Sequence, residues 1–326
     1  MGKLSVPSLR DLLACPSCHG ALDEKDQLFV CFVCGAVFPI EDGIPVFADK
    51  SATEHDELDH IAPSGGSNGR PDEGSHKANQ AAWFDRAQHA EFEIERPTGT
   101  PAFYRFLLTE KFRRAIQPLG GRLDRRTALA VCGGSGMDAE LLARAGASVI
   151  SSDISLGAAK RAQERAHRHG ISIFSIVADV EHLPFRDRSV DLVYVHDGLH
   201  HLTEPRRGLR EMARVSAHWV SITEPARATV TDLAIKLGLA LAREESGNVV
   251  ARLEPGVVEQ HLRETGFRVV RSERYAMYYR HFPGSVFAAL SRPWLFGPAT
   301  AGWRMANLAF GRLGNKLAVV AERQDR

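Results

Sequence analysis

Four of the five cysteines in this 326-residue chain form two Cys-x-x-Cys pairs near the N-terminus. Cys15 and Cys18 form the first pair, Cys31 and Cys34 form the second, and twelve residues separate the pairs. Two such pairs supply the four thiolates of a closed tetrahedral zinc site. Disulfide bonds would instead require an oxidising compartment, which no other feature of the sequence indicates. We therefore predict a structural Zn²⁺ ion, because a segment of about 45 residues buries too few apolar side chains to fold unaided.

A second candidate site is the glycine-rich stretch from Cys132 to Gly136. It follows the apolar residues 127–131, which fit a buried parallel strand. Its glycines let a ligand approach the backbone at the start of the next helix. A second strand at 147–151 leads to Asp153, and a carboxylate at the end of such a strand accepts hydrogen bonds from the hydroxyls of a ribose. The spacing therefore predicts a cofactor that contains a nucleoside.

Two cofactors are compatible with this turn. Gly134, Gly136 and Ala139 satisfy a relaxed dinucleotide fingerprint, which permits NAD, although a lone match of this kind has little specificity. Two more strands are expected at 173–179 and 187–195. The stretch ADVEHLPFRDRSVDLV, which joins them, and the LHHL motif that follows are more specific than the glycines.

Residues 125–225 carry these motifs and resemble the class I S-adenosylmethionine-dependent methyltransferases, in particular the small-molecule group that includes quinone-biosynthesis enzymes. The resemblance implies a seven-stranded, doubly wound α/β sheet of the Rossmann-like type, with S-adenosyl-L-methionine as the cofactor. It also implies which residues bind that cofactor. They are Cys132, Gly133, Gly134 and Gly136 along the methionine part, Asp153 and Ile154 at the ribose, Asp179 and Val180 at the adenine, and His196 facing the sulfonium methyl group.

Two positions depart from the pattern of that family. Ala130 stands where an acidic residue is usual, which removes an anchor near the charged methionine end of the cofactor. Cys132 stands where glycine is usual, and its side chain narrows the turn. A domain with both changes would fit a scaffold that no longer catalyses. Because Asp153 and Asp179 are both retained, we favour an active enzyme.

Four side chains are candidates for a general base. His196, His200 and His201 follow the fourth strand, and Glu224 ends a fifth strand at 219–223, where open α/β sheets place their ligands. A structural role is the alternative for the adjacent histidines, because LHHL recurs in the family that the chain resembles. Methyl transfer from a sulfonium group is an in-line displacement, in which positioning supplies most of the acceleration and a base serves acceptors that must lose a proton.

The cysteine-containing segment has a resemblance of its own. LLACPSCHGALDEKDQLFVCFVCGAVFPIEDGIPVF, and above all its tail from Phe38 to Phe47, is similar to the zinc-ribbon activator subunits of methyltransferases. In that family the ribbon stabilises its partner by packing on it, so the resemblance implies a built-in support. It also opens the alternative of an RNA or protein methyltransferase.

The C-terminal part is expected to select the acceptor. Helices at 229–242 and 255–266 precede two strands at 267–273 and 315–322, which the family places as an antiparallel pair at one sheet edge. The segment 276–314 contains no Asp or Glu but several arginines and aromatic residues. It fits either a pocket lid with ordinary core aromatics or a basic surface that contacts a membrane or an anionic lipid-linked acceptor. Contact with nucleic acid is a third alternative, which the net charge of +1 disfavours.

These observations divide the chain into three parts. We expect a zinc-ribbon domain with four cysteine ligands, then a flexible linker that is polar and lacks periodic apolar residues, then the methyltransferase domain. The expected bounds are 1–48, 49–80 and 81–326, the last with N-terminal helices at 81–120, a cofactor-binding core at 121–225 and substrate-side elements at 226–326.

The expected activity is methyl transfer to an O, N or C atom of a small molecule, lipid or glycan. No signal peptide and no run of about 18 apolar residues is recognisable. We therefore expect a cytoplasmic protein, peripheral to the membrane where the basic segment contacts lipid. The sequence indicates neither the acceptor nor an oligomeric state.

Overall fold

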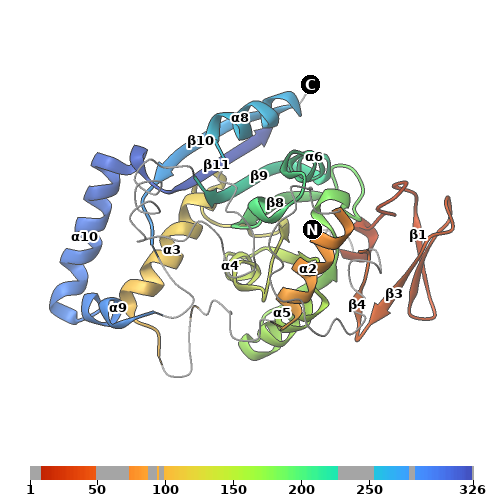
Figure 1. Ribbon diagram of the computed structural model, residues 1–326, viewed down its shortest axis with the longest axis horizontal. Helices are drawn as coiled ribbons and strands as arrows, with labels where there is room; N and C mark the ends of the chain where they lie inside the picture. The colour runs from red at the N-terminus through yellow and green to blue at the C-terminus, as the bar shows by residue number, and fades with distance from the viewer. Residues whose placement is uncertain are drawn as a thin grey trace, which may run out of the picture.

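The computed structural model describes residues 9–48, 73–86, 94, 99–226, 253–278 and 283–324. The predicted helix at 229–242 and the first part of the predicted linker lie outside them. A seven-stranded sheet with helices on both faces dominates the described residues, and a small four-stranded sheet lies beside it (Figure 1). The seven strands are β5 (Thr127–Val131), β6 (Ser148–Asp153), β7 (Ile173–Val177), β8 (Val190–His196), β9 (Ser216–Pro225), β10 (Phe267–Tyr275) and β11 (Lys316–Arg323).

The strand order of the large sheet is β10-β11-β9-β8-β5-β6-β7. Strands β5 to β9 run parallel, whereas β11 is antiparallel to both β9 and β10. The prediction of a seven-stranded doubly wound sheet, with a final antiparallel pair at one edge, is confirmed. The order reverses at β5, which lies between β6 and β8. Open α/β sheets bind ligands outside the carboxyl ends of their strands at such a reversal.

Helices cover both faces of this sheet. Helices α3 (Ala102–Ile116) and α4 (Met137–Arg144) pack on one face, and α6 (Pro205–Val215) and α8 (Pro255–Glu264) pack on the other. Helix α5 (Leu156–His169) contacts β6 and β7. Strand β5 is buried at every residue, as expected for a central parallel strand that is covered on both sides. The short 3-10 helices are η1 (Leu9–Leu12), η2 (Gln117–Leu119), η3 (Val180–His182), η4 (Leu199–His201) and η5 (Gly311–Leu313).

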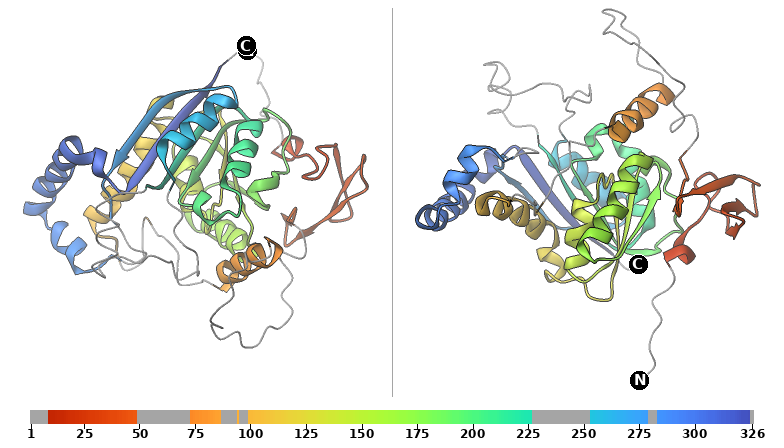
Figure 2. Two further views of the ribbon diagram at one scale, coloured as in Figure 1. Left: turned by 45° about the horizontal axis from the view of Figure 1, so that its top comes forward. Right: turned by 90° about the horizontal axis from the view of Figure 1, so that it is seen from below.

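The small sheet lies against β7, the edge strand of the large sheet (Figure 2). The Phe47 N–H donates a hydrogen bond to the Val177 carbonyl at 2.7 Å, and the Ala14 N–H donates to the Pro184 carbonyl at 2.9 Å. The first of these contacts occupies part of the edge of β7, whose backbone groups would otherwise lack protein partners. The strands of the small sheet are β1 (Leu22–Lys25), β2 (Leu28–Cys31), β3 (Val37–Glu41) and β4 (Ile44–Pro45).

Apolar side chains join the two sheets into one packed unit. Leu13, Phe29 and Phe47 belong to the same buried cluster as Ile176 and Phe185 of the large domain. The Phe29 and Phe47 ring centroids lie 5.6 Å apart. Burial of this kind stabilises both partners, because each covers apolar surface of the other. The N-terminal segment therefore has the geometry of an internal support.

Helix α2 (Glu73–Arg86) begins inside the stretch 49–80 that the composition predicted as a flexible linker. That prediction is wrong for its last eight residues. Lys77 of α2 donates to Asp179 at 2.8 Å and to Glu181 at 2.7 Å. These partners lie far along the chain, so the polar composition of α2 did not reveal them.

Helices α9 (Ser285–Leu290) and α10 (Pro293–Phe310) project from one end of the molecule beside α3 (Figure 1). On α3, the ring of Phe106 meets Phe296 and Trp303 of α10, with centroid distances of 6.4 and 5.4 Å. No residue of α10 is buried. Among the described residues, no helix is both long enough and apolar enough to span a bilayer.

Candidate functional site

The glycine-rich turn connects β5 to α4 at the carboxyl edge of the sheet. Gly136, with a φ of +83°, is the N-cap of α4. A Cβ atom there would lie 2.9 Å from the Ala162 Cβ, so glycine lets the turn and α5 approach this closely. Gly133 donates its N–H to the Ser152 carbonyl at 2.9 Å. The turn is thus held against the end of β6.

Cys132 adopts a φ of +50°, in the left-handed region that residues other than glycine seldom occupy. A Cβ atom added to Gly198 would lie 2.3 Å from the Cys132 Cβ. The glycine at position 198 therefore accommodates the side chain that was predicted to narrow the turn. Burial raises the pKa of the Cys132 thiol, and the charges of Asp153 and Glu224 add to this rise. The thiol therefore stays protonated near neutral pH and is a poor nucleophile.

Asp153 is the last residue of β6 and links that strand to the turn. Its carboxylate accepts hydrogen bonds from the Gly134 N–H at 2.8 Å and from the Ser155 N–H at 3.0 Å. Burial raises the pKa of Asp153, while these two backbone donors act in the opposite direction. A carboxylate has about four acceptor positions, so two N–H donors leave capacity for the two hydroxyls of a ribose.

Asp179 follows β7 and lies one strand further along the carboxyl edge. It accepts hydrogen bonds from the Glu181 N–H at 2.9 Å and from the Lys77 ammonium at 2.8 Å. Burial alone would raise the pKa of Asp179, but hydrogen bonds from His182 and Lys77 lower it to about 2. The carboxylate is therefore ionised near neutral pH and is a strong hydrogen-bond acceptor.

Helix α2 connects the surroundings of these two carboxylates. Its Lys77 contacts Asp179, and its Asp85 accepts hydrogen bonds from the Ser155 hydroxyl at 2.5 Å and the Gly157 N–H at 2.8 Å. Sequence reasoning missed α2 as part of the site. The only signal was that order was expected to resume near this point of the chain.

His196 ends β8 and lies in a buried group of charged residues. Its Nδ1 atom is 2.9 Å from the Lys111 Nζ and 3.2 Å from an Asp138 oxygen. Its Nε2 atom is 3.1 Å from an Asp197 oxygen, and Lys316 forms an ion pair with Asp197. Both ring nitrogens thus face charged groups. Sequence reasoning identified His196 but missed the four charged residues of this group, whose types alone are those of ordinary surface residues.

Of the other base candidates, Glu224 binds the loop after β8, which contains His200 and His201. Glu224 accepts hydrogen bonds from the Gly198 and Leu199 N–H groups, both at 2.7 Å, and lies 2.8 Å from the His200 Nδ1. Glu224 is fully buried and His200 is 4% exposed. The His201 ring lies 4.1 Å from that of His200. This geometry favours a structural task for Glu224 and His200.

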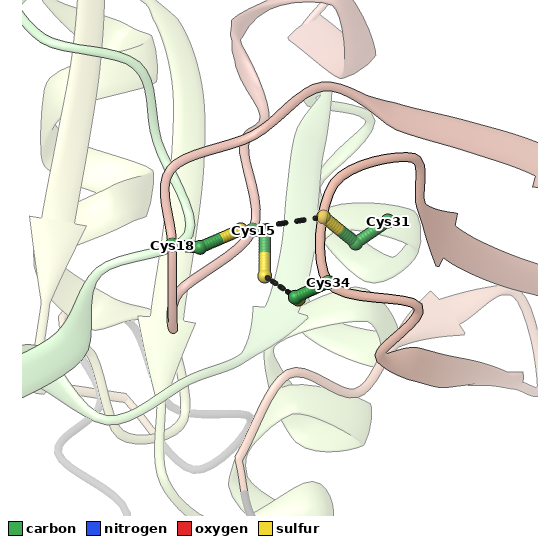
Figure 3. A group of neighbouring side chains, drawn as sticks. All are labelled: Cys15, Cys18, Cys31 and Cys34. Carbon is green, nitrogen blue, oxygen red and sulfur yellow. Dashed lines mark hydrogen bonds between the residues drawn. The ribbon is translucent and has the colours of Figure 1, made fainter.

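The four cysteines of the N-terminal pairs converge on one point, as Figure 3 shows. Their sulfur atoms lie within 4.8 Å of one another. The Cys15–Cys34 and Cys18–Cys31 sulfur distances are 3.6 and 3.4 Å. A tetrahedral zinc site with Zn–S bonds of about 2.3 Å places its sulfurs about 3.8 Å apart, whereas a disulfide needs about 2.05 Å. The donor set therefore fits a closed structural zinc site.

Comparison with known families matches both parts of the chain. Residues 7–43 match the Trm112p-like proteins, and residues 129–218 match the methyltransferase domain family. A demethylmenaquinone methyltransferase of Renibacterium salmoninarum is 35% identical over 108 residues, which cover 33% of this chain and 44% of the relative. The chain thus spans less than half the length of that relative. A UPF0434 protein of Azotobacter vinelandii is 45% identical over 49 residues, which cover 14% of this chain and 79% of that protein.

Solved structures share the fold at low sequence identity. Magnesium protoporphyrin IX methyltransferase from Synechocystis, solved with bound SAH, superposes with a TM-score of 0.52 at 16% identity, covering 77% of this chain and 98% of that one. The [4+2]-cyclase SpnF superposes with a TM-score of 0.53 at 18% identity, covering 76% of this chain and 97% of that one. At sequence identities of 16 and 18% these likenesses show the fold alone. One of the two proteins is a cyclase, so the shared fold does not define the reaction. From the family matches and the cysteine geometry, the N-terminal segment of the chain belongs with the UPF0434 and Trm112p-like proteins, and it is joined to a segment that matches the methyltransferase domain family.

Proposed function

We propose that the chain transfers a methyl group from S-adenosylmethionine to an O, N or C atom of a small-molecule acceptor. One observation carries this proposal: the Asp153 carboxylate at the end of β6 is hydrogen-bonded to Gly134 of the glycine-rich turn. This hydrogen bond holds together the carboxylate that would bind the ribose and the turn that would bind the rest of the cofactor. The methyltransferase family match over residues 129–218 favours this cofactor over NAD.

The cofactor would lie along the carboxyl edge of three neighbouring strands. Asp153 with Ile154 would bind the ribose, and Asp179 with Val180 would bind the adenine. The turn from Cys132 to Gly136 would follow the methionine part. When bound, the cofactor supplies a methyl group on a positively charged sulfur. Transfer of this methyl group breaks the bond to sulfur and leaves the rest of the cofactor as a neutral thioether. The Asp179 carboxylate accepts a hydrogen bond from Lys77. An adenine amino group would donate to the same carboxylate, either beside Lys77 or in its place.

Of the four candidate bases we retain His196 on the acceptor side. Its neighbours Asp197 and Lys316 have side chains that are 24% and 13% exposed, so a ligand can reach them. An acceptor that must lose a proton would transfer it to His196. Lys316 would then stabilise the negative charge that develops on the acceptor. Positioning next to the sulfonium methyl group supplies the remaining acceleration.

For the N-terminal segment we propose a structural Zn²⁺ ion held by the four cysteines. The metal would fold the ribbon, and the folded ribbon would support the edge strand β7. The Trm112p-like match also supports a second candidate function, methylation of RNA or protein. Salt-sensitive binding to RNA would favour that candidate.

We further propose that the acceptor is lipid-linked and that residues 276–314 contact a membrane surface. The outward side of α10 exposes Trp294, Met305 and Leu308 by 69, 70 and 90%. Exposed Arg292 and Arg312 flank this apolar surface, and the segment contains no acidic residue. An apolar helix face beside cations suits the interface of an anionic bilayer. The name of the relative from Renibacterium, a demethylmenaquinone methyltransferase, also supports an apolar acceptor.

The test is formation of S-adenosylhomocysteine from S-adenosylmethionine by the zinc-loaded protein. A panel of naphthoquinols, other phenols and amines is offered with and without anionic vesicles. We expect product only when an acceptor is present, and faster turnover of apolar acceptors on vesicles. No turnover with any of these acceptors, together with turnover of an RNA or protein substrate, would favour the second candidate function.

A further inference from the structure

A buried charged group lies beside the glycine-rich turn, and Asp138 is at its centre. One Asp138 oxygen accepts a hydrogen bond from the Tyr194 hydroxyl at 3.0 Å and lies 3.5 Å from the Lys111 Nζ. The other oxygen lies 3.2 Å from the His196 Nδ1. We call Lys111, Asp138, Tyr194 and His196 the Asp138 cluster.

The place of the Asp138 cluster in the sheet indicates which part of the cofactor it meets. The strand order runs β8-β5-β6-β7, so the predicted adenine and ribose positions lie at β7 and β6. A cofactor bound there extends past the turn towards β8. That remaining part is an amino acid with an α-ammonium group and a carboxylate, next to the sulfonium. Asp138 lies two residues after Gly136, and Tyr194 and His196 belong to β8.

Asp138 has the most exposed side chain of this cluster. Lys111 is fully buried, whereas the Asp138 side chain is 13% exposed. Burial would raise the pKa of Asp138, but the charges of Lys111 and His196 hold it well below its usual range. A buried lysine is strongly destabilising without a partner of opposite charge. Lys111 therefore fixes an ionised carboxylate whose remaining surface a ligand can reach.

The Asp138 carboxylate lies on the same face of the sheet as Ala130. In the register of the sheet, Ala130 of β5 is paired with Tyr194 of β8, and paired residues on neighbouring strands share one face. Asp138 binds the Tyr194 hydroxyl on that same face. The Asp138 carboxylate thus lies above the face from which a longer side chain at position 130 would project.

We propose that Asp138 binds the α-ammonium group of the cofactor and so supplies the negative charge that Ala130 lacks. In this binding role Lys111, Tyr194 and His196 are positioning residues, because they hold the Asp138 carboxylate. The role proposed above for His196 as a base concerns its other ring nitrogen, Nε2, which faces Asp197. The inference rests on the proposed function, since it requires that the turn holds S-adenosylmethionine.

The test compares two ligands that differ in the amino acid part. S-adenosylhomocysteine carries the α-ammonium group, whereas 5′-methylthioadenosine has the same nucleoside and thioether but no amino acid. We expect Asp138→Asn to weaken calorimetric binding of S-adenosylhomocysteine by about tenfold or more, the effect of one charged hydrogen bond. Binding of 5′-methylthioadenosine should not change. Adding Ala130→Asp to Asp138→Asn should restore most of the lost affinity.

Because Asp138→Asn leaves Lys111 buried without its carboxylate, the same titrations are made on the Lys111→Met/Asp138→Asn double variant. The same selective loss is expected there. Equal weakening of both ligands, or unchanged binding of S-adenosylhomocysteine, would overturn the assignment of Asp138. If the unaltered protein binds 5′-methylthioadenosine but not S-adenosylhomocysteine, the assignment also fails. If it binds neither ligand, the proposed function itself fails, and the inference with it.

Discussion

Glu224 provides a sharp test of how the structure assigns residues near the acceptor. Its place at the end of a strand made it a candidate base, but its carboxylate is fully buried. It accepts two backbone N–H groups of the loop after β8 and contacts His200. Replacement by alanine removes the acceptor that all three donors share.

The expected loss of stability follows from these contacts. Hydrogen bonds to a charged group contribute about 1.5–3 kcal/mol each, and the cost of desolvating the carboxylate offsets part of their sum. Removing one member of a buried charged network typically costs about 3–5 kcal/mol. We therefore expect Glu224→Ala to lower the free energy of unfolding by about 3–5 kcal/mol. Glu224→Gln keeps an oxygen acceptor for the loop and should lower it by only about 1–2 kcal/mol.

The assay is urea unfolding of the zinc-loaded protein, followed by tryptophan fluorescence, with calorimetric titration of S-adenosylhomocysteine on the glutamine variant. We expect a lower midpoint in the alanine variant and retained ligand binding in the glutamine variant. The reasoning would be refuted by an alanine variant as stable as the unaltered protein. It would also be refuted by a glutamine variant that is fully stable, binds the ligand normally and has lost methyl transfer, since that pattern describes a base.

Three further predictions follow from the ribbon, α10 and Asp179. Removal of zinc by a chelator, or Cys31→Ser, should lower the thermal unfolding midpoint of the whole protein, because the ribbon and the large domain share one core; a metal-free protein with an unchanged midpoint would contradict this. Leu308→Asp should abolish co-sedimentation with phosphatidylglycerol vesicles, whereas Phe32→Asp, at a ribbon position exposed by 72%, should leave it intact; equal binding by both variants would count against α10. The pKa of Asp179 is lowered from 3.8 to about 2, so its ionised form stabilises the fold above about pH 4 and this contribution is lost as the pH falls through about 2. The urea midpoint should therefore fall less between about pH 4 and pH 2 in Asp179→Asn than in the unaltered protein. An equal fall in both proteins would refute a stabilising role for ionised Asp179.

Local patterns in the sequence were sufficient for most of the large sheet. Short apolar runs bounded by glycines and acidic residues predicted the strands, and Asp153 stands at the end of β6 as expected. Helices were expected within 81–120, and α3 forms there with Phe103 and Leu107 on its buried side. These features depend on neighbouring residues only, which explains why the sequence displays them.

The remaining parts of the site depend on partners far apart in the chain. Lys111 lies in a helix, where a lysine is ordinarily read as facing solvent, yet it is fully buried against Asp138 and His196. The polar composition of α2 suggested a linker, whereas its contacts from Lys77 to Asp179 and from Asp85 to Ser155 show what holds the helix there. Tertiary pairing of this kind leaves no periodic signal, so the sequence alone did not reveal it.

The central claim, that the glycine-rich turn and Asp153 hold S-adenosylmethionine, is tested most directly by calorimetric titration of the zinc-loaded protein. S-adenosylmethionine, S-adenosylhomocysteine and NADH are titrated separately into the unaltered protein and into Asp153→Ala. We expect both sulfur-containing ligands to bind, with affinity reduced about tenfold or more in the variant because charged hydrogen bonds to the ribose are lost. NADH should not bind. A folded protein that binds neither sulfur-containing ligand, or that binds NADH alone, would contradict the account.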